Sequence, residues 1–235
     1  MLKAVFFDLD GTLLPNRETE FANVYFSLLA ETVAPYGYDP KKLIENIWAG
    51  TKKMIANDGK KTNYDVFWDY FKTIYGEEKA RDIALFDRFY ANEFKGTKAV
   101  CGENPLAKEI VRECRRKTGK VVLTTNPLFP LQGNLTRMAF VGLEKTDFDL
   151  ITCYENSHFC KPNPKYFTEV LEKMNLRPEE VVLFGNNTLE DGACAAAAGI
   201  KCYLVGDLII RSPETDRTFP EIPMGDILKV VDELL

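Results

Sequence analysis

The sequence predicts an α/β protein in which a doubly wound parallel sheet carries an inserted bundle of helices. Three observations predict this fold. A short hydrophobic strand at residues 4–7 ends in two aspartates and a turn. Residues 18 to 95 show helical periodicity with almost no strand signal, and from about residue 105 strands and helices alternate. Such alternation is typical of parallel sheets covered by helices.

Length and composition set the limits within which a function can be sought. The chain has 235 residues, of which 46% are hydrophobic and 28% charged, so it can bury a full core. The net charge is −5 and no basic tract stands out, which argues against a nucleic-acid partner. No apolar run approaches the roughly 20 residues that span a bilayer. Acidic residues interrupt the N-terminal apolar run too early for a signal peptide, so we expect a cytoplasmic protein without a membrane partner.

The cysteines and the single histidine give no sign of a metal site. The six cysteines form no CxxC pair and show no zinc spacing, so we interpret them as core residues in a reducing compartment. His158 is the only histidine and excludes sites with several histidine ligands. We interpret it as a surface or supporting residue.

The first strand leads directly into the strongest chemical signal, Asp8 and Asp10. In an extended segment residues two apart point to the same side, and ligands bind beyond the carboxyl ends of parallel strands. Two carboxylates held that close need compensation, which Mg²⁺ with its preference for oxygen ligands can supply. One carboxylate is then left to attack phosphorus as a nucleophile. The simpler alternative is a pair of aspartates that cap a turn.

The helical insertion begins shortly after these aspartates in the sequence. Apolar residues recur at helical spacing in four stretches, and Asp39 with Pro40 is typical of a helix start. A polar loop at residues 57–63 separates the second stretch from the third. The predicted domains are therefore a helical insertion at residues 18–96 and a core formed by residues 1–17 and 97–235. Both connections of the insertion must lie near the aspartates. The apolar positions are Phe21, Val24, Tyr25, Leu28 and Leu29, then Leu43, Ile44 and Ile47, then Val66, Phe67, Tyr70, Phe71 and Ile74, then Ala80, Ile83, Phe86, Phe89, Tyr90 and Phe94.

The remaining chain alternates between the two kinds of element. Strands are expected at residues 120–124, 148–153, 181–184 and 201–205, and helices at 105–117, from Asn163 to about Met174, in an alanine-rich stretch ending at Gly199, and at 226–234. Turn signals fill residues 211–224.

Polar residues stand where these elements end or begin. Thr125 and Asn126 follow a strand, where a hydroxyl and a backbone N–H suit a phosphate oxygen, although turns also commonly begin this way. Lys161 precedes a proline-rich helix start and can neutralise a nucleophile and a phosphate together, although most lysines are solvated. Asn186 and Asp191 follow the strand at 181–184.

Taken together, these stretches resemble a known family. FFDLDGTL, VVLTTN, KPNPKYF and VVLFGNNTLED are similar, in order, to the four motifs of the haloacid dehalogenase-like (HAD) hydrolases. The insertion resembles the helical type 1 cap of that family, and the resemblance implies a Rossmann-like core. The chain departs from the pattern at Asn186, where the family carries an acidic residue, whereas Asp191 matches the second acidic position.

The resemblance implies a phosphohydrolase that acts on a small phosphate ester through an aspartyl-phosphate. Asp8 is then the nucleophile and Asp10 the general acid and base, a residue that favours phosphate esters over haloacids. Thr125, Asn126 and Lys161 hold the phosphate oxygens.

The resemblance also implies Mg²⁺ as cofactor, held by Asp8, the carbonyl of Asp10, Asp191 and Asn186. The neutral Asn186 leaves alternatives open, because it removes one charge from the metal site: a phosphomutase of the same fold, or an attenuated protein that binds phosphate or a partner. Neither the substrate nor the oligomeric state, monomer or homodimer, follows from the sequence. Weak candidates for contacts to an anionic substrate are Lys52, Lys53, Lys60 and Lys61.

Overall fold

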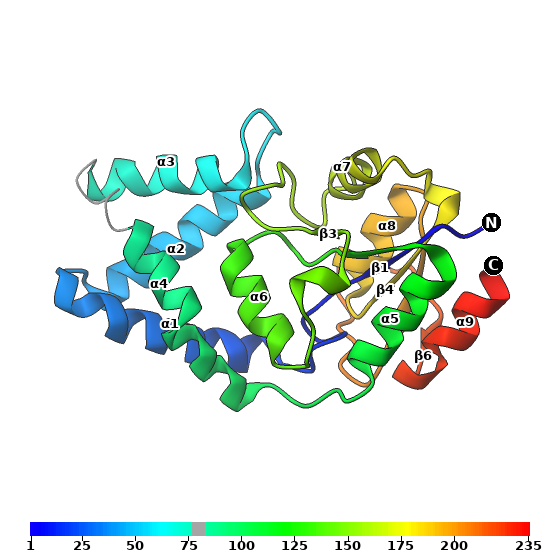
Figure 1. The fold of residues 1–235 in the computed structure, drawn as a ribbon. Coiled ribbons are helices and arrows are strands. Elements are labelled where there is room, and N and C mark those ends of the chain that lie inside the picture. Colours follow the sequence, from blue (N-terminus) through cyan, green and yellow to red (C-terminus); the bar gives the residue numbers. More distant parts are fainter. Residues whose placement is uncertain (77–82) are drawn as a thin grey trace.

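The computed structural model describes residues 1–76 and 83–235. Figure 1 shows a layer of helices at one end of the molecule and a sheet flanked by helices at the other, with both chain termini at the sheet end. The predicted α/β fold, a parallel sheet with inserted helices, is confirmed.

The sheet has six strands, and every pair of neighbours is parallel. Its order is β3-β2-β1-β4-β5-β6, so the chain first builds outward on one side of β1 and then crosses back to build on the other. The order reverses at β1, and this is where open α/β sheets bind their ligands. The strands are β1 (Ala4–Phe7), β2 (Lys120–Leu123), β3 (Leu150–Ile151), β4 (Val181–Gly185), β5 (Lys201–Val205) and β6 (Glu221–Ile222).

Strand β1 is the centre of the core and is fully buried on both faces. Val5 and Phe7 pack into one hydrophobic cluster with α5 (Ala107–Thr118) and α9 (Ile227–Leu234). Ala4 and Phe6 pack into a second cluster with α7 (Lys165–Met174) and α8 (Cys194–Ala197). Burial on both sides explains why this strand is an unbroken apolar run rather than an alternating one.

The helical layer consists of α1 (Glu18–Val33), α2 (Pro40–Ile55), α3 (Asn63–Tyr75) and α4 (Ile83–Ala91), followed by a 3₁₀ helix at Glu93–Val100. As predicted, the Asp39 side chain caps α2 by accepting the Lys42 N–H at 2.9 Å, and Pro40 lies in the first turn. Aromatic side chains dominate the core of this layer. Ala80, assigned from the sequence to the fourth helix, lies outside the described residues. The division into two domains remains a prediction.

Four elements differ from the sequence prediction. The strand expected at residues 148–153 shrinks to Leu150–Ile151, and next to it the Asp149 side chain, rather than a backbone carbonyl, accepts the Val121 N–H at 2.9 Å. Helix α6 (Leu131–Ala139) was not predicted, and the short β6 falls within a stretch that was assigned to turns. The alanine-rich helix begins as a π-helix at Thr188–Ala193 and continues as α8.

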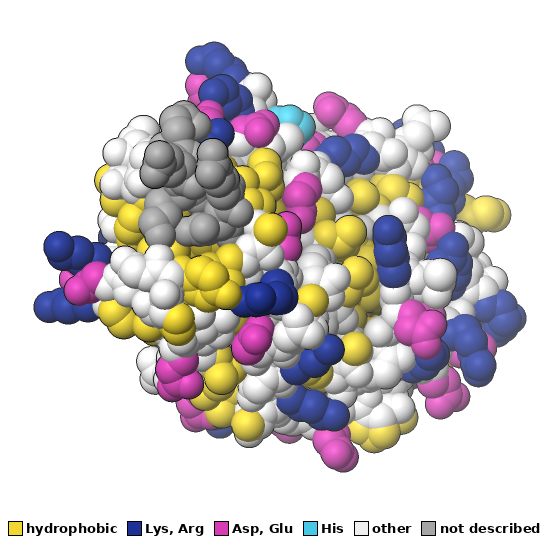
Figure 2. Space-filling model, turned by 60° about the vertical axis from the view of Figure 1, so that its left-hand side comes forward, with side chains coloured by type: hydrophobic (Ala, Val, Ile, Leu, Met, Phe, Trp, Pro, Cys, Tyr) yellow, Lys and Arg dark blue, Asp and Glu magenta, His cyan; other side chains and the backbone are white. Residues whose placement is uncertain are grey.

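Hydrophobic side chains are exposed on one face of the helical layer. Figure 2 shows hydrophobic side chains gathered over this layer, whereas charges of both signs are interspersed elsewhere on the same face. Large hydrophobic side chains exposed there include Tyr36, Trp48, Ile55 and Ile74. Within the described residues, every helix is too short or too polar to cross a membrane.

Candidate active site

The register of the central strands brings the first two motifs to one edge of the sheet. Phe7 pairs with Leu123 on one side and with Phe184 on the other, so β1 and β2 end level and β4 ends one residue further on. The Asp8 N–H donates to the Phe184 carbonyl at 2.9 Å, which holds the aspartate directly beyond the strand end. Thr125 emerges from the neighbouring strand end, and its side chain is buried.

Lys161 joins two of the predicted carboxylates. Its Nζ lies 2.9 Å from Asp8 Oδ1 and 2.5 Å from Asp191 Oδ1, and its side chain is only 1% exposed. The loop before α7 therefore places Lys161 between Asp8 of the first motif and Asp191 of the fourth. The sequence led us to expect this lysine beside Asp8, whereas its contact with Asp191 was not predicted.

The electrostatics at this edge disfavour the ionised form of Asp8. Burial lowers the pKa of Lys161, but the carboxylates of Asp191 and Asp8 outweigh burial and raise it well above its ordinary value. The pKa of Asp8 is raised to about 8. Burial is the largest cause and outweighs the lowering effect of Lys161, and the charges of Asp191 and Asp10 add to the rise. The single ammonium group of Lys161 thus does not offset the cost of ionising the buried Asp8.

Asn186 and Asp191 shape the turn after β4. Asp191 Oδ2 accepts the backbone N–H groups of Asn186 and Asn187, both at 3.0 Å. Gly185 is required there, because a Cβ atom would lie 2.4 Å from Asp191 Cγ. Asn186 Nδ2 donates to the Leu208 carbonyl at 2.8 Å. A carboxylate accepts hydrogen bonds but donates none, so an aspartate at position 186 would lose this contact.

Asp10 is held from two sides. Asn16 Nδ2 donates to its Oδ1 at 2.6 Å, and the Arg137 guanidinium forms an ion pair with its Oδ2. Arg137 comes from α6, is 2% exposed, and also donates to Asn134 Oδ1 at 2.5 Å. Its guanidinium carbon lies 4.4 Å from the ring centroid of Phe129. Sequence reasoning missed Arg137, because it stands in no motif and in no predicted helix.

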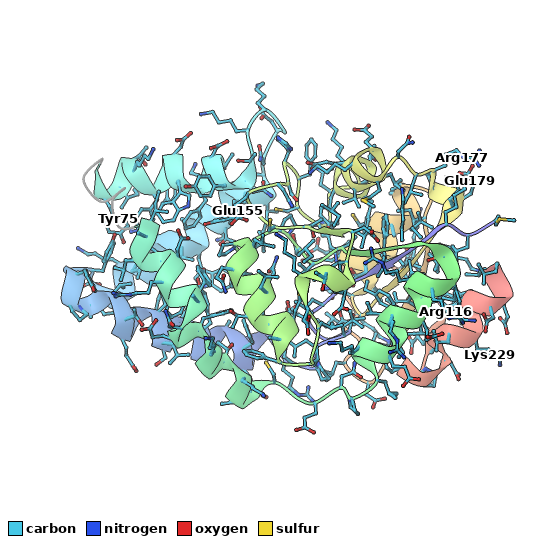
Figure 3. All side chains as sticks on the ribbon, in the orientation of Figure 1. Tyr75, Arg116, Glu155, Arg177, Glu179 and Lys229 are labelled. Atoms are coloured by element: carbon cyan, nitrogen blue, oxygen red, sulfur yellow. The ribbon has the colours of Figure 1, made fainter. Side chains whose placement is uncertain are left out.

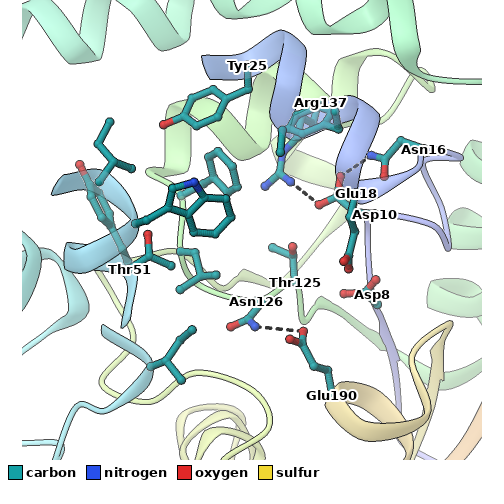
Figure 4. A pocket seen from close by; sticks show the side chains of 18 of the residues that line it. Asp8, Asp10, Asn16, Glu18, Tyr25, Thr51, Thr125, Asn126, Arg137 and Glu190 are labelled. Carbon is teal, nitrogen blue, oxygen red and sulfur yellow. Dashed lines mark hydrogen bonds and ion pairs between the residues drawn. The ribbon is translucent and has the colours of Figure 1, made fainter. Parts of the chain in front are cut away.

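Thr125 and Asn126, two of the three residues predicted to bind phosphate, line a pocket together with Asp8, whereas Lys161 does not line it. Figure 4 shows Thr125 and Asn126 facing Asp8 and Asp10 across it. Asn126 Nδ2 donates to Glu190 Oε2 at 3.0 Å, while Asn126 Oδ1 is buried without a hydrogen-bond partner. Burial raises the pKa of Glu190 to about 7, and Asp191 adds to the rise.

The donor set suits Mg²⁺ better than a soft or caged metal. In the described part of the chain, no three acidic, histidine or cysteine side chains converge as a ready-made metal cage. Asp8 and Asp191 supply two carboxylates around one ammonium group, and amide and backbone oxygens lie beside them. Mg²⁺ is usually held by one or two carboxylates together with waters and substrate phosphates. A divalent cation beside Asp8 would favour its ionised form and offset the effect of burial, so these residues fit the ion.

Comparison with known proteins assigns the family. The sequence profile of the haloacid dehalogenase-like hydrolases matches residues 2–199. The chain belongs to this family. Glyceraldehyde 3-phosphate phosphatase of Methanothermobacter thermautotrophicus is 29% identical over 87% of this chain and 86% of its own length. A phosphorylated carbohydrates phosphatase of Thermotoga maritima is 27% identical over the full length of both chains.

A solved structure of similar shape supports the fold. The HAD phosphatase of Thermococcus onnurineus superposes with a TM-score of 0.60 at 20% identity and covers 98% of both chains. The prediction of a HAD hydrolase of the phosphatase type is therefore confirmed at the level of the family.

Other polar residues considered from the sequence lie outside the pocket. His158 Nδ1 lies 2.7 Å from Glu169 Oε1, in keeping with its interpretation as a supporting residue. Lys60 and Lys61 pair with Asp58 and Asp69 on the surface. Like these two, Lys52 and Lys53 do not line the pocket that contains Asp8.

Proposed function

We propose that this HAD hydrolase is a Mg²⁺-dependent phosphatase that cleaves a small phosphate ester through an aspartyl-phosphate. The observation that carries the proposal is the buried Lys161 between Asp8 and Asp191, at the edge of a pocket that Asp8 lines. The two named relatives act on phosphorylated compounds, which supports a phosphate ester as the substrate class.

In the first step, a carboxylate oxygen of Asp8 attacks phosphorus and the bond to the leaving oxygen breaks. Asp10 gives its proton to that oxygen, so the product leaves as an alcohol. In the second step, Asp10 takes a proton from a water that attacks the aspartyl-phosphate and releases inorganic phosphate. Asn16 and Arg137 fix the orientation of Asp10 for both transfers.

The remaining predicted residues stabilise charge. Lys161, Thr125 and Asn126 are assigned to the phosphate oxygens, since positioning and charge stabilisation supply most of the catalysis of phosphoryl transfer. Mg²⁺ would be held by Asp8, the Asp10 carbonyl, Asp191 and the amide oxygen of Asn186. When bound, it supplies positive charge that screens the phosphoryl group from the carboxylates.

The test is hydrolysis of p-nitrophenyl phosphate while Mg²⁺ is titrated from zero to tens of millimolar, with Asp8→Asn assayed beside the wild type. We expect turnover that requires Mg²⁺ and that Asp8→Asn reduces to background, because an amide is a far weaker nucleophile than a carboxylate. Undiminished turnover in Asp8→Asn would refute the nucleophile assignment. Absence of turnover in the wild type at every Mg²⁺ concentration would favour a protein that only binds phosphate or a partner.

A further inference from the structure

The pocket that contains Asp8 extends far beyond the phosphate site. It has a volume of about 360 Å³ and reaches from the strand ends into the helical layer. Figure 4 shows the acidic residues at one end and Tyr25 and Thr51 toward the other. The part that lies among α1, α2, α3 and α4 is called the cap half here.

The cap half is apolar and largely aromatic. Residues that line it include Phe26, Ile47, Trp48, Ile55, Phe67 and Trp68. Of the described residues around the whole pocket, Arg137 alone carries a basic side chain, and its guanidinium is bound to Asp10. The cap half therefore offers no cation to a second phosphate or a carboxylate on the substrate.

Several polar atoms of the aromatic side chains around the cap half are paired with one another. The hydroxyl groups of Tyr25 and Tyr90 lie 2.9 Å apart. Trp68 Nε1 donates to the Tyr154 hydroxyl at 3.3 Å. Thr51 supplies a further hydroxyl. A sugar buried here would bring several hydroxyl groups to a wall with few partners for them, and an unpartnered buried hydroxyl is unfavourable.

We propose that the cap half holds the leaving group of the phosphate ester, and that this group is a ring-sized apolar alcohol rather than a sugar. The inference rests on the phosphatase function proposed above. An apolar cavity of about 150 Å³ accommodates benzene, so a pocket of about 360 Å³ has room for a six-membered ring together with a phosphoryl group. Aromatic walls favour such a ring because they remove its apolar surface from water.

Two esters that differ mainly in their hydroxyl groups test the proposal on the full chain with Mg²⁺. Cyclohexylmethyl phosphate and glucose 6-phosphate are both esters of a primary alcohol attached to a six-membered ring. We expect kcat/KM for cyclohexylmethyl phosphate to be higher by about tenfold or more, the scale of discrimination by an apolar pocket. An equal or higher value for glucose 6-phosphate would overturn the inference.

Parallel assays with p-nitrophenyl phosphate separate the two proposals. Turnover of p-nitrophenyl phosphate that Asp8→Asn abolishes, combined with no preference for cyclohexylmethyl phosphate, refutes the leaving-group inference and leaves the phosphatase intact. If none of the three esters is hydrolysed, both proposals fail.

A matched pair of variants places the preference in the cap half. Ile55 and Ile74 lie near the ends of α2 and α3 and are 41% and 48% exposed, so both tolerate a polar substitution. Ile55 lines the pocket and Ile74 does not. We expect Ile55→Asn to reduce the preference for cyclohexylmethyl phosphate by about tenfold, and Ile74→Asn to leave it unchanged. An unchanged preference in Ile55→Asn, or an equal loss in both variants, contradicts the assignment.

Discussion

Arg137 shows how a single residue outside the motifs controls one inside them. Its guanidinium contacts the carboxylate of Asp10 and the side chain of Asn134, and it stacks on the ring of Phe129. A planar group with several fixed donors can do this, whereas a lysine ammonium is a compact charge without that geometry. Arg137 is thus a positioning residue for the proposed acid and base.

The orientation of Asp10 matters most when the leaving oxygen needs a proton. We expect Arg137→Lys to lower kcat for cyclohexylmethyl phosphate by about 10- to 100-fold, since general acid catalysis contributes about 10²- to 10⁴-fold. The loss for p-nitrophenyl phosphate should be smaller, because p-nitrophenolate leaves without prior protonation. Steady-state kinetics at saturating substrate measure both values.

An exposed arginine provides the control for this prediction. Arg115 forms a surface ion pair with Asp149, with their nitrogen and oxygen atoms 2.8 Å apart, so Arg115→Lys should change neither rate. Equal losses on the two esters in Arg137→Lys would instead indicate a purely structural role.

At the scale of elements, the turn after β1 depends on a close contact between two loops. Gly11 has φ +78°, and a Cβ atom there would lie 2.0 Å from Asn186 Nδ2. Gly37, which follows the 3₁₀ helix at Ala34–Tyr36, has a similar φ of +83° but no atom within 4 Å of its Cβ position. The two glycines therefore share the backbone strain and differ in the steric clash.

This pair separates the two costs of adding a methyl group. Gly37→Ala should lower the free energy of unfolding by about 1–2 kcal/mol, the cost of a left-handed backbone. Gly11→Ala should cost about 1–3 kcal/mol more, because Asn186 must move and leave the Leu208 carbonyl unpaired. Urea unfolding measures both values. The additional cost should diminish in an Asn186→Ala background, and equal losses in the two single variants would contradict the explanation.

The elements with strong periodicity were predictable, and those held by distant contacts were not. β1 and the helices around Phe21, Leu43 and Phe67 follow from apolar spacing alone. Helix α6 contains Gly133, Asn134 and Thr136, which are weak helix formers. It is held by contacts remote in sequence: the Asn134 side chain donates to the Thr152 carbonyl at 2.8 Å, and Thr136 Oγ1 donates to the Tyr90 carbonyl at 2.9 Å.

The site shows the same limit of local reasoning. The sequence predicted that Asp8, Lys161 and Asp191 belong together, because each stands in a recognisable motif, and the structure brings them into contact. Arg137 contacts Asp10 although the two residues are 127 positions apart, and no sequence pattern near either residue indicates that they pair. Glu190 lies next to a motif residue, but its contact with Asn126 depends on how two strand ends align.

At the scale of the whole molecule, the helical layer contacts the core beyond its two chain connections. The Asn63 and Tyr64 N–H groups at the start of α3 donate to the carbonyls of Ser157 and Tyr154, both at 2.8 Å. Asn63 Nδ2 also lies 3.2 Å from Cys160 Sγ, next to Lys161. The loop that carries Lys161 is therefore also hydrogen-bonded to α3, one of the helices that form the cap half. The same contacts thus hold both Lys161 and the wall of the cap half in place.

At the amino ends of its central strands, opposite the candidate site, the sheet is stabilised by a charged cluster around Glu180. Lys3 Nζ lies 2.6 Å from Glu180 Oε1, and the Arg177 backbone N–H and guanidinium donate to the same carboxylate, both at 3.0 Å. Figure 3 shows Arg177 beside Glu179 at this edge, far from the helical layer. The bonds from Lys3 and Arg177 lower the pKa of Glu180 from 4.5 to about 2. The cluster joins the start of β1 to the residue before β4.

This shift predicts how stability depends on pH. A carboxylate whose pKa is lower in the folded chain stabilises it fully above the unfolded value of 4.5, and the contribution is lost as the pH falls toward 2. We expect Glu180→Gln to be less stable than the wild type near neutral pH, with a difference that shrinks steadily once the pH drops below about 4.5. Urea unfolding of both proteins along a pH series measures this difference. Glu179→Gln is the matched control, because its side chain is 63% exposed and its pairing with Arg177 contributes little to stability. A difference between wild type and Glu180→Gln that stays constant as the pH falls would show that packing, rather than charge, makes Glu180 important.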